Sequence, residues 1–239
     1  LTLLAALMVA SPPSCGTADR ARDAAPHHYV FFRRDHERIA DTSFLRNTHL
    51  VGAQLTYTWR ELEPTPDHYE FRPIRERLEF LTRHNKRLFL QLQDVSFSET
   101  MVTPDYLRSD SAYHGGVARK YETGADGVAH FGGWVARRWD PSVRARFARL
   151  LTALAREFDG SIEGVVLAET SVGFEDPARL PSGFSAVAYA AGILDMLTAA
   201  RGAFRQSCVV IYANFMPGES LPADDHGFLR SVYAHAAAI

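Results

Sequence analysis

The chain has 239 residues, of which 46% are apolar and 23% are charged, and its formal net charge is -2. These values are ordinary for a soluble globular protein and leave room for one large domain or two small ones. Positive residues are interspersed with acidic ones and form no long basic run, which argues against an extended nucleic-acid surface. The ten histidines are scattered, and no pair has the spacing of a zinc motif, so we expect neither a metal site nor a cofactor.

The segment 1–15 begins with an apolar run and continues with small residues up to Cys15. This pattern is typical of a secretory signal, and the run 1–10 is too short to span a bilayer as a helix. We therefore expect an exported protein without a transmembrane span, either secreted, periplasmic or a cell-surface lipoprotein. The segment also resembles a bacterial lipoprotein signal, so a lipid anchor at Cys15 stays open. Residues 16–27 are polar and small and are interpreted as a linker.

The chain has two cysteines, Cys15 and Cys208. Cys208 begins an apolar run and is expected to be a small, buried core residue. A disulfide between the two is not expected, because Cys15 lies in the segment that we expect to be processed.

After the linker, strand and helix patterns alternate along the chain. Residues 29–32 predict a short strand, and a weakly helical segment, 35–47, follows. A second strand, 51–59, is rich in Thr, Tyr and Trp. The segment 72–85 predicts an amphipathic helix, because its apolar residues recur at helical spacing. Residues 87–94 predict the third strand.

The second half of the chain continues this alternation after a long interruption. Residues 99–139 are expected to be irregular, and their aromatic side chains argue against disorder. A helix is predicted for 140–160, with Asp140 as its N-cap and a proline in the first position. The apolar run 165–168 predicts the fourth strand. The remaining predicted elements are a long Ala-rich helix (182–206), a fifth strand (208–214) and a last helix (224–238).

Strands that alternate with helices predict an α/β protein with a parallel sheet. No Gly-rich phosphate loop follows the first strands, which disfavours an open nucleotide-binding sheet. Polar and aromatic residues gather where the strands end, as in the (β/α)8 TIM-type barrel, whose active sites are built at that end. About five βα units fit in the chain, whereas a barrel has eight. We therefore expect 28–239 to be a partial TIM-barrel catalytic domain, in a sequence truncated at both ends.

Three segments resemble one family of enzymes. In 52–71 a strand ends in Trp and is followed by an acidic Leu-Glu-Pro turn and a Tyr-x-Phe sequence, and 86–97 follows as the next strand. This pattern is similar to the retaining glycoside hydrolases of the (β/α)8-barrel clan, which include the cellulase-like and β-galactosidase-like enzymes. GVVLAET (164–170) falls where those enzymes carry the acid/base glutamate at the end of the fourth strand. The resemblance covers about 50–215.

The resemblance implies an exported glycoside hydrolase that acts on a poly- or oligosaccharide by a retaining mechanism. Such a mechanism needs two carboxyl groups about 5–5.5 Å apart, one that protonates the leaving oxygen and one that attacks the sugar. Glu169 fits the first role, and strand alternation predicts that it shares the barrel interior with Val165 and Leu167. The alternative is that Glu169 has only a structural role and is paired with an arginine. In the family, the nucleophile lies on the seventh strand, which we expect beyond Ile239.

Sugars bind to aromatic faces and to planar polar side chains. The aromatic candidates are expected to stack on the sugar, with ordinary core packing as their alternative. The amide candidates are expected to bind hydroxyl groups, because two glutamines in an apolar strand need partners inside the barrel. A strand-end carboxylate either binds a hydroxyl group or caps a loop. The candidate substrate-binding residues are Tyr57, Trp59, Gln91, Gln93, Asp94, Trp134 and Asn214.

Two other functions stay open. Ala168 stands where the family usually has Asn, so the main alternative is a non-catalytic carbohydrate-binding barrel at the cell surface, an enzyme relic. A carboxylate on the seventh strand would separate this alternative from the hydrolase. A barrel enzyme of another chemistry, such as an aldolase, would need a strand-end Lys or a late phosphate loop, and the third to fifth strands end without Lys.

Overall fold

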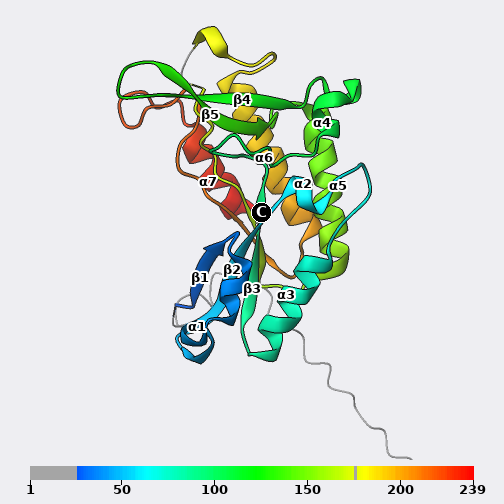
Figure 1. Ribbon diagram of the computed structural model, residues 1–239. Helices are drawn as coiled ribbons and strands as arrows, with labels where there is room; N and C mark the ends of the chain where they lie inside the picture. The colour runs from blue at the N-terminus through cyan, green and yellow to red at the C-terminus, as the bar shows by residue number, and fades with distance from the viewer. Residues whose placement is uncertain (1–25, 175–176) are drawn as a thin grey trace, which may run out of the picture.

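The computed structural model describes residues 26–174 and 177–239, and its centre is a five-stranded parallel sheet (Figure 1). The strand order is β1-β2-β3-β6-β7, and every neighbouring pair is parallel. Parallel strands joined by helices confirm the α/β class and the succession of βα units that the sequence predicts. The strands are β1 (His28–Arg33), β2 (Leu50–Thr58), β3 (Arg87–Gln93), β6 (Gly164–Leu167) and β7 (Cys208–Ile211).

Capping side chains fix where the two longest helices begin. The carboxylate of Asp140 accepts hydrogen bonds from the backbone nitrogens of Ser142 (2.8 Å) and Val143 (3.2 Å), as its predicted role requires. The Ser185 hydroxyl caps α6 in the same way. The helices are α1 (Thr42–Arg46), α2 (Trp59–Leu62), α3 (Arg72–Arg83), α4 (Tyr106–Ser109), α5 (Pro141–Phe158), α6 (Ala186–Ala203) and α7 (Phe228–Ala238), with 3₁₀ turns at His36–Ala40, Ser111–Tyr113 and Pro177–Arg179.

The two faces of the sheet differ in character. Leu90 pairs with Leu55 and with Val165, and all three side chains are fully buried in the hydrophobic core. Residues that pair in register on parallel strands share a face, so this is the face that the helices cover. Gln91, the next residue of β3, pairs with Thr56 and lies on the opposite face, which corresponds to a barrel interior.

This register corrects one expectation about β6. Val165 and Leu167 are buried in the core and face the helices, whereas Val166 pairs with Gln91 and faces the interior. The prediction that Val165 and Leu167 share the interior with Glu169 is therefore wrong. Strand β6 ends at Leu167, and because Glu169 lies beyond that end, strand alternation no longer determines the direction of its side chain.

The segment expected to be irregular contains an antiparallel hairpin, formed by β4 (Val117–Thr123) and β5 (Ala129–Ala136). The hairpin is attached to the chain after β3, because the backbone nitrogen of Ser96 donates to the carbonyl of Trp134 at 2.7 Å. Gly133 makes this approach possible, since a Cβ atom there would lie 2.2 Å from the carbonyl oxygen of Ser96. Gly132 and Gly133, in the segment expected to be irregular, therefore belong to a strand.

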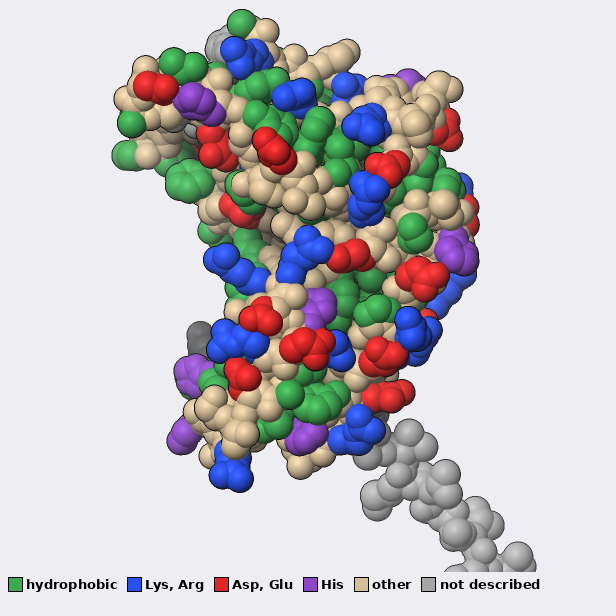
Figure 2. Space-filling view, viewed as in Figure 1, with side chains coloured by type: hydrophobic (Ala, Val, Ile, Leu, Met, Phe, Trp, Pro, Cys, Tyr) green, Lys and Arg blue, Asp and Glu red, His purple; other side chains and the backbone are tan. Residues whose placement is uncertain are grey.

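The sequence predicts that Cys208 is a buried core residue without a disulfide. In the structure it is half-buried at the start of β7 and is disulfide-bonded, so both expectations are wrong. The other cysteine, Cys15, lies outside the described residues, as do the whole predicted signal segment 1–15 and most of the predicted linker 16–27. Over 26–174 and 177–239, no helix combines the length and the apolar character that a transmembrane span requires. Figure 2 shows positive and negative side chains interspersed over the visible face.

Candidate active site

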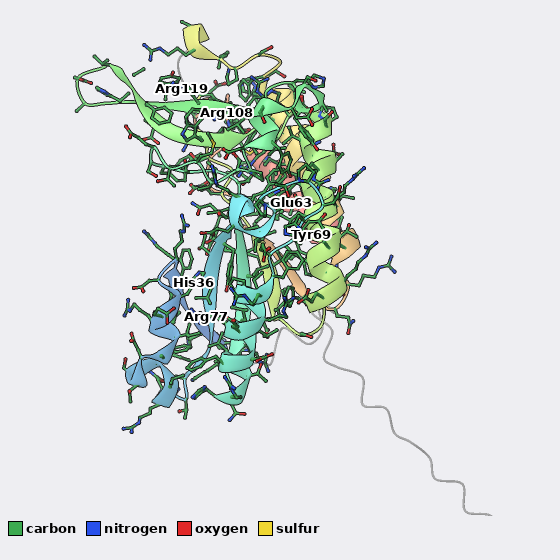
Figure 3. The ribbon with its side chains drawn as sticks, turned by 45° about the vertical axis from the view of Figure 1, so that its right-hand side comes forward. His36, Glu63, Tyr69, Arg77, Arg108 and Arg119 are labelled. Carbon is green, nitrogen blue, oxygen red and sulfur yellow. The ribbon has the colours of Figure 1, made fainter. Side chains whose placement is uncertain are left out.

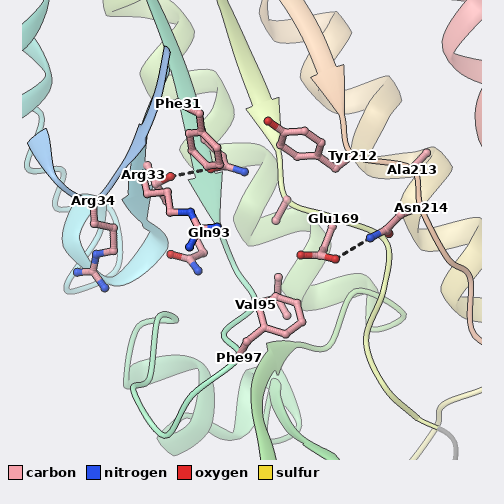
Figure 4. Close-up of a pocket in the computed structure, with 13 residues that line it drawn as sticks. Phe31, Arg33, Arg34, Gln93, Val95, Phe97, Glu169, Tyr212, Ala213 and Asn214 are labelled. Carbon is pink, nitrogen blue, oxygen red and sulfur yellow. Dashed lines mark hydrogen bonds between the residues drawn. The ribbon is translucent and has the colours of Figure 1, made fainter. Parts of the chain in front are cut away.

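A cavity of about 620 Å³ opens at the carboxyl end of the parallel strands (Figure 4). This volume lies in the range of small-molecule sites, and the position is the one where barrel enzymes build their active sites. Its walls combine aromatic, amide and charged side chains. The lining residues are Phe31, Arg33, Arg34, Thr56, Gln91, Gln93, Val95, Phe97, Ala168, Glu169, Tyr212, Ala213 and Asn214.

The carboxylate of Glu169 lies in this cavity and is held by Asn214. The Asn214 Nδ2 donates to Glu169 Oε2 at 2.7 Å (Figure 4). The orientation of the amide is fixed, because its Oδ1 accepts from the backbone nitrogens of Ser171 (3.2 Å) and Phe215 (2.9 Å). The NH₂ group must therefore point to the carboxylate, which fixes one oxygen of Glu169.

A buried arginine holds the backbone of Glu169. Arg138 and Asp94 are 1% and 2% exposed, and the guanidinium binds both carboxylate oxygens of Asp94, at 2.6 and 2.8 Å. Its Nη1 donates to the carbonyl of Glu169 and to the Tyr189 hydroxyl, each at 2.7 Å. Although burial by itself disfavours the charge, Asp94 and Tyr189 raise the pKa of Arg138 above its ordinary value. The chain just after β3 and the chain just after β6 are thus tied to one permanent cation.

Amide and hydroxyl groups form the floor of the cavity. Thr56 donates from its hydroxyl to Gln91 Oε1 at 2.6 Å, which fixes that amide. Across the interior, Gln54 donates to the hydroxyl of Tyr212 at 2.9 Å. The Oε1 of Gln93 is buried and has no hydrogen-bond partner among the described residues. It is therefore an unsatisfied acceptor within the wall of the cavity.

Behind one wall lies a buried lysine of β4. Lys120 is fully buried, its Nζ donates to the carbonyl of Ser96 at 3.2 Å, and the same nitrogen lies 3.3 Å from the ring centre of Phe97. The carboxylate oxygen Oε1 of Glu122 lies 3.9 Å from Lys120 Nζ, at the limit of an ion pair. Burial lowers the pKa of Lys120 to about 8, against the opposing charges of Glu122 and Glu169. Phe97 therefore separates a poorly neutralised cation from the cavity.

No protein-family model matches the sequence, and no curated protein is detectably similar to it. The β-galactosidase of the psychrophilic Marinomonas ef1 matches with a TM-score of 0.53 and 11% identity over 78% of this chain and 37% of its own. The GH5_18 protein of Bifidobacterium longum subsp. longum, solved with Manβ1-4GlcNAc, matches with a TM-score of 0.51 and 10% identity, over 78% and 43%. GH5_18 of Streptomyces cattleya, solved with GlcNAc, gives 0.51 and 10%, over 77% and 44%.

The chain has the fold of part of a (β/α)8 barrel. The resemblance to barrel glycosidases that the sequence predicts is thereby confirmed at the level of the fold. The chain spans less than half of the length of these three proteins. In the barrel, β6 is the fourth of the parallel strands, and Glu169 follows its end.

Four of the residues proposed from the sequence meet in the barrel cavity: Glu169, Gln91, Gln93 and Asn214. They come from three strand ends, β3, β6 and β7, that lie side by side in the sheet. The period-two placement of Gln91 and Gln93 puts both on the interior face, which is why an apolar strand carries them.

The two aromatic residues at the end of β2 lie elsewhere. Tyr57 shares the helix-covered face with Leu55 and is 2% exposed, with its ring 4.5 Å from that of His36. Trp59 is 1% exposed in α2, and its Nε1 donates to the buried carboxylate of Glu63 at 2.9 Å. Glu63 lies next to α2 (Figure 3). Neither lines the cavity, so neither is retained as a stacking platform.

Asp94 and Trp134 also lie outside the cavity lining. Both oxygens of Asp94 are taken by Arg138, so this carboxylate supports the site without facing it. Trp134 is partly buried in β5, where its Nε1 donates to the carbonyl of Glu99 at 3.1 Å and its ring packs on that of Phe131. The segment around Trp134, which the sequence predicts to be irregular, is a strand of the hairpin.

The sequence interpretation missed several residues of the cavity. Thr56 could have been found, because it pairs with Gln91 on the neighbouring strand. Tyr212 directly follows the end of β7, and Phe97 lies in the chain after β3. Arg33 ends β1, a strand that carried no site prediction. Within the described ranges, no cluster of three or more His, Cys, Asp or Glu side chains could hold a metal ion.

Proposed function

We propose that the protein is a glycoside hydrolase that acts on a poly- or oligosaccharide by a retaining mechanism, with Glu169 as the acid/base residue. One observation carries this proposal: the Glu169 carboxylate faces a 620 Å³ cavity at the end of the fourth parallel strand of a glycosidase-type barrel. The hydrogen bond from Asn214 and the anchored backbone hold that carboxylate in one place. Fixed geometry of this kind is what proton transfer requires.

In the proposed reaction, Glu169 first donates its proton to the glycosidic oxygen as the bond to the sugar breaks. The resulting carboxylate then removes a proton from the water that attacks the anomeric carbon. Asn214 hydrogen-bonds one oxygen, Oε2, which leaves Oε1 for the proton transfer. The roles differ between the steps, but the same atom faces the substrate in both.

The mechanism needs a second carboxylate as nucleophile, about 5–5.5 Å from the first. Glu169 is the one carboxylate among the described residues that line the cavity. Glu61 and Asp94 lie near the same strand ends, but each is paired with an arginine. We therefore propose that the nucleophile comes from the seventh strand of the full barrel.

Substrate binding is assigned to the groups that face the cavity. Gln91, Gln93 and Asn214 are proposed to bind sugar hydroxyl groups, because all three line the cavity. Phe97 and Tyr212, which are 51% and 40% exposed, offer the aromatic faces on which a sugar ring stacks.

A non-catalytic carbohydrate-binding barrel is the second candidate function. The observation that favours it is Ala168, which lines the cavity at the position where the resemblance expects Asn. Such a protein would bind oligosaccharides in the same cavity without turning them over. Turnover therefore separates the two candidates.

We also propose that the protein is exported. A lipid anchor at Cys15 is not proposed, because the other cysteine of the chain, Cys208, is disulfide-bonded. The support for export is the apolar segment 1–15 with its small residues. Mass spectrometry of the processed N-terminus, together with cell fractionation, tests this. A cytosolic protein with an intact 1–15 segment contradicts it.

The proposed activity is tested with the full-length protein and a panel of oligosaccharides and aryl glycosides that includes β-galactosides and β-mannosides. Glu169→Gln should lower turnover by orders of magnitude without loss of folding. The matched control is Glu163→Gln, at the other end of β6, where the carboxylate pairs with Arg87 at 3.0 Å and faces no cavity. Equal turnover in both variants contradicts the role of Glu169.

A further inference from the structure

Arg33 adopts an unusual backbone conformation at the end of β1. Its φ is +57°, a value that residues other than glycine rarely take. The pairing of β1 with β2 also shifts here, because Phe31 pairs with Gln54 and Arg33 already pairs with Leu55. One extra residue, Phe32, is thereby accommodated in β1, as in a bulge. Bulges and positive φ values often re-aim a side chain at a functional site.

The bulge gives neighbouring residues of β1 different surroundings. Phe32 is buried in the core, whereas Phe31 and Arg33 both line the cavity. In the close-up, Arg33 and Glu169 lie on different sides of the cavity (Figure 4). The strained backbone therefore places a guanidinium on the wall opposite the candidate acid/base residue.

The two arginines of the cavity differ in their partners. Arg34 is neutralised by Glu61, whose Oε1 lies 2.5 Å from its Nη2. The guanidinium of Arg33 is exposed and has no hydrogen bond or ion pair with any described residue. Its guanidinium offers five donors in a planar fork, which matches a carboxylate or a sulfate group.

The charges around the cavity leave Arg33 as the cation without a counter-charge among the described residues. Arg34 pairs with Glu61, and Lys120, behind the Phe97 ring, has Glu122 at 3.9 Å. Glu169 is the one carboxylate among the described lining residues, and Asn214 hydrogen-bonds it. An anionic substituent bound at Arg33 would therefore meet a guanidinium that no described carboxylate neutralises.

We propose that the carbohydrate recognised by this cavity is anionic, with a carboxylate or a sulfate ester that the Arg33 guanidinium binds bidentately. This inference rests on the proposed function for the site itself and adds the class of sugar. Gln91, Gln93 and Asn214 then bind the hydroxyl groups, and Arg33 selects the charged substituent. A neutral sugar would offer the exposed Arg33 guanidinium no counter-charge.

The experiment measures binding by calorimetry and turnover in the full-length protein. The probes are matched pairs of short oligosaccharides: uronic-acid-containing, sulfated, and neutral with the same linkages. Arg33→Gln removes the charge, Arg33→Lys keeps it without the fork, and Arg83→Gln is the control, since Arg83 is exposed at the end of α3. We expect the anionic probe to bind at least tenfold more weakly to Arg33→Gln, with partial recovery in Arg33→Lys and a weakened salt dependence.

The outcomes separate this inference from the proposed function. The inference is supported if the wild type prefers the uronic-acid probe or the sulfated probe and Arg33→Gln loses this preference. The preferred probe then identifies the anionic group as a carboxylate or a sulfate ester. Binding or turnover of neutral probes only, unchanged in Arg33→Gln, overturns it while the hydrolase stands. Binding of anionic probes without turnover of any probe upholds Arg33 and overturns the hydrolase. Absence of binding to every probe overturns both.

Discussion

Arg138 donates a hydrogen bond from Nη1 to the main-chain carbonyl of Glu169 at 2.7 Å. The same guanidinium is held by Asp94, whose carboxylate binds it through two nitrogens. The position of Glu169 therefore depends on a buried ion pair that does not reach the cavity. A glycosidase needs its acid/base group fixed to within a fraction of an ångström. In the proposed mechanism, the Asp94–Arg138 pair therefore positions Glu169 without touching the substrate.

Asp94→Asn should lower the free energy of unfolding by about 3–5 kcal/mol, because it leaves the buried charge of Arg138 without its counter-charge. Urea unfolding of the purified protein measures the change. The paired replacement Asp94→Leu with Arg138→Met should be less destabilising than the sum of the single changes, since it removes both charges together. Strictly additive losses would contradict the coupling.

Asn214→Ala should lower turnover about tenfold to a hundredfold, because a hydrogen bond to a charged group contributes about 1.5–3 kcal/mol. Asn214 is exposed, so the free energy of unfolding should change little. Steady-state kinetics and thermal unfolding of the same preparation separate the two effects. Unchanged turnover would remove Asn214 from the site.

Lys120→Met should change the pH dependence of stability. The pKa of Lys120 in the folded state, about 8, is below its ordinary value of 10.5, so the folded state binds fewer protons than the unfolded state between these pH values. The penalty for burying the charge is fully present below pH 8 and is relieved as the pH rises from about 8 towards 10.5. The stability of wild type minus that of Lys120→Met should therefore rise from pH 7 to pH 9.5. A flat difference, measured by chemical denaturation, would contradict this.

The strand succession could be predicted from the sequence because each strand is a local pattern. The apolar run 165–168 reads as buried on both sides, and the alternation of Gln91 and Gln93 with leucines marks one interior face. The sequence pattern could therefore predict four cavity residues, because they stand at or near the ends of the strands that it defines. They are Glu169, Gln91, Gln93 and Asn214. The barrel rule then brings such ends together.

The remaining features depend on partners that are distant in the sequence. Trp59 follows a strand end like the cavity residues, but it points at Phe147 of α5, with ring centres 5.0 Å apart. Asp94 becomes structural only because Arg138 reaches it from beyond the hairpin. The hairpin was not predictable from local pattern either. It depends on Gly133, whose lack of a side chain allows the backbone of Ser96 to approach. No local periodicity carries this information.

The most direct test of the central claim is azide rescue in the full-length protein, with an aryl glycoside that the wild type hydrolyses and that has a good leaving group. Such a leaving group needs little acid assistance, so Glu169→Ala should still form the glycosyl-enzyme but should release it slowly. Azide needs no general base. It should therefore restore turnover and yield a glycosyl azide with the anomeric configuration of the substrate. Wild-type turnover in Glu169→Ala without azide, or loss of turnover that azide does not restore, would contradict the assignment of Glu169 as the acid/base residue.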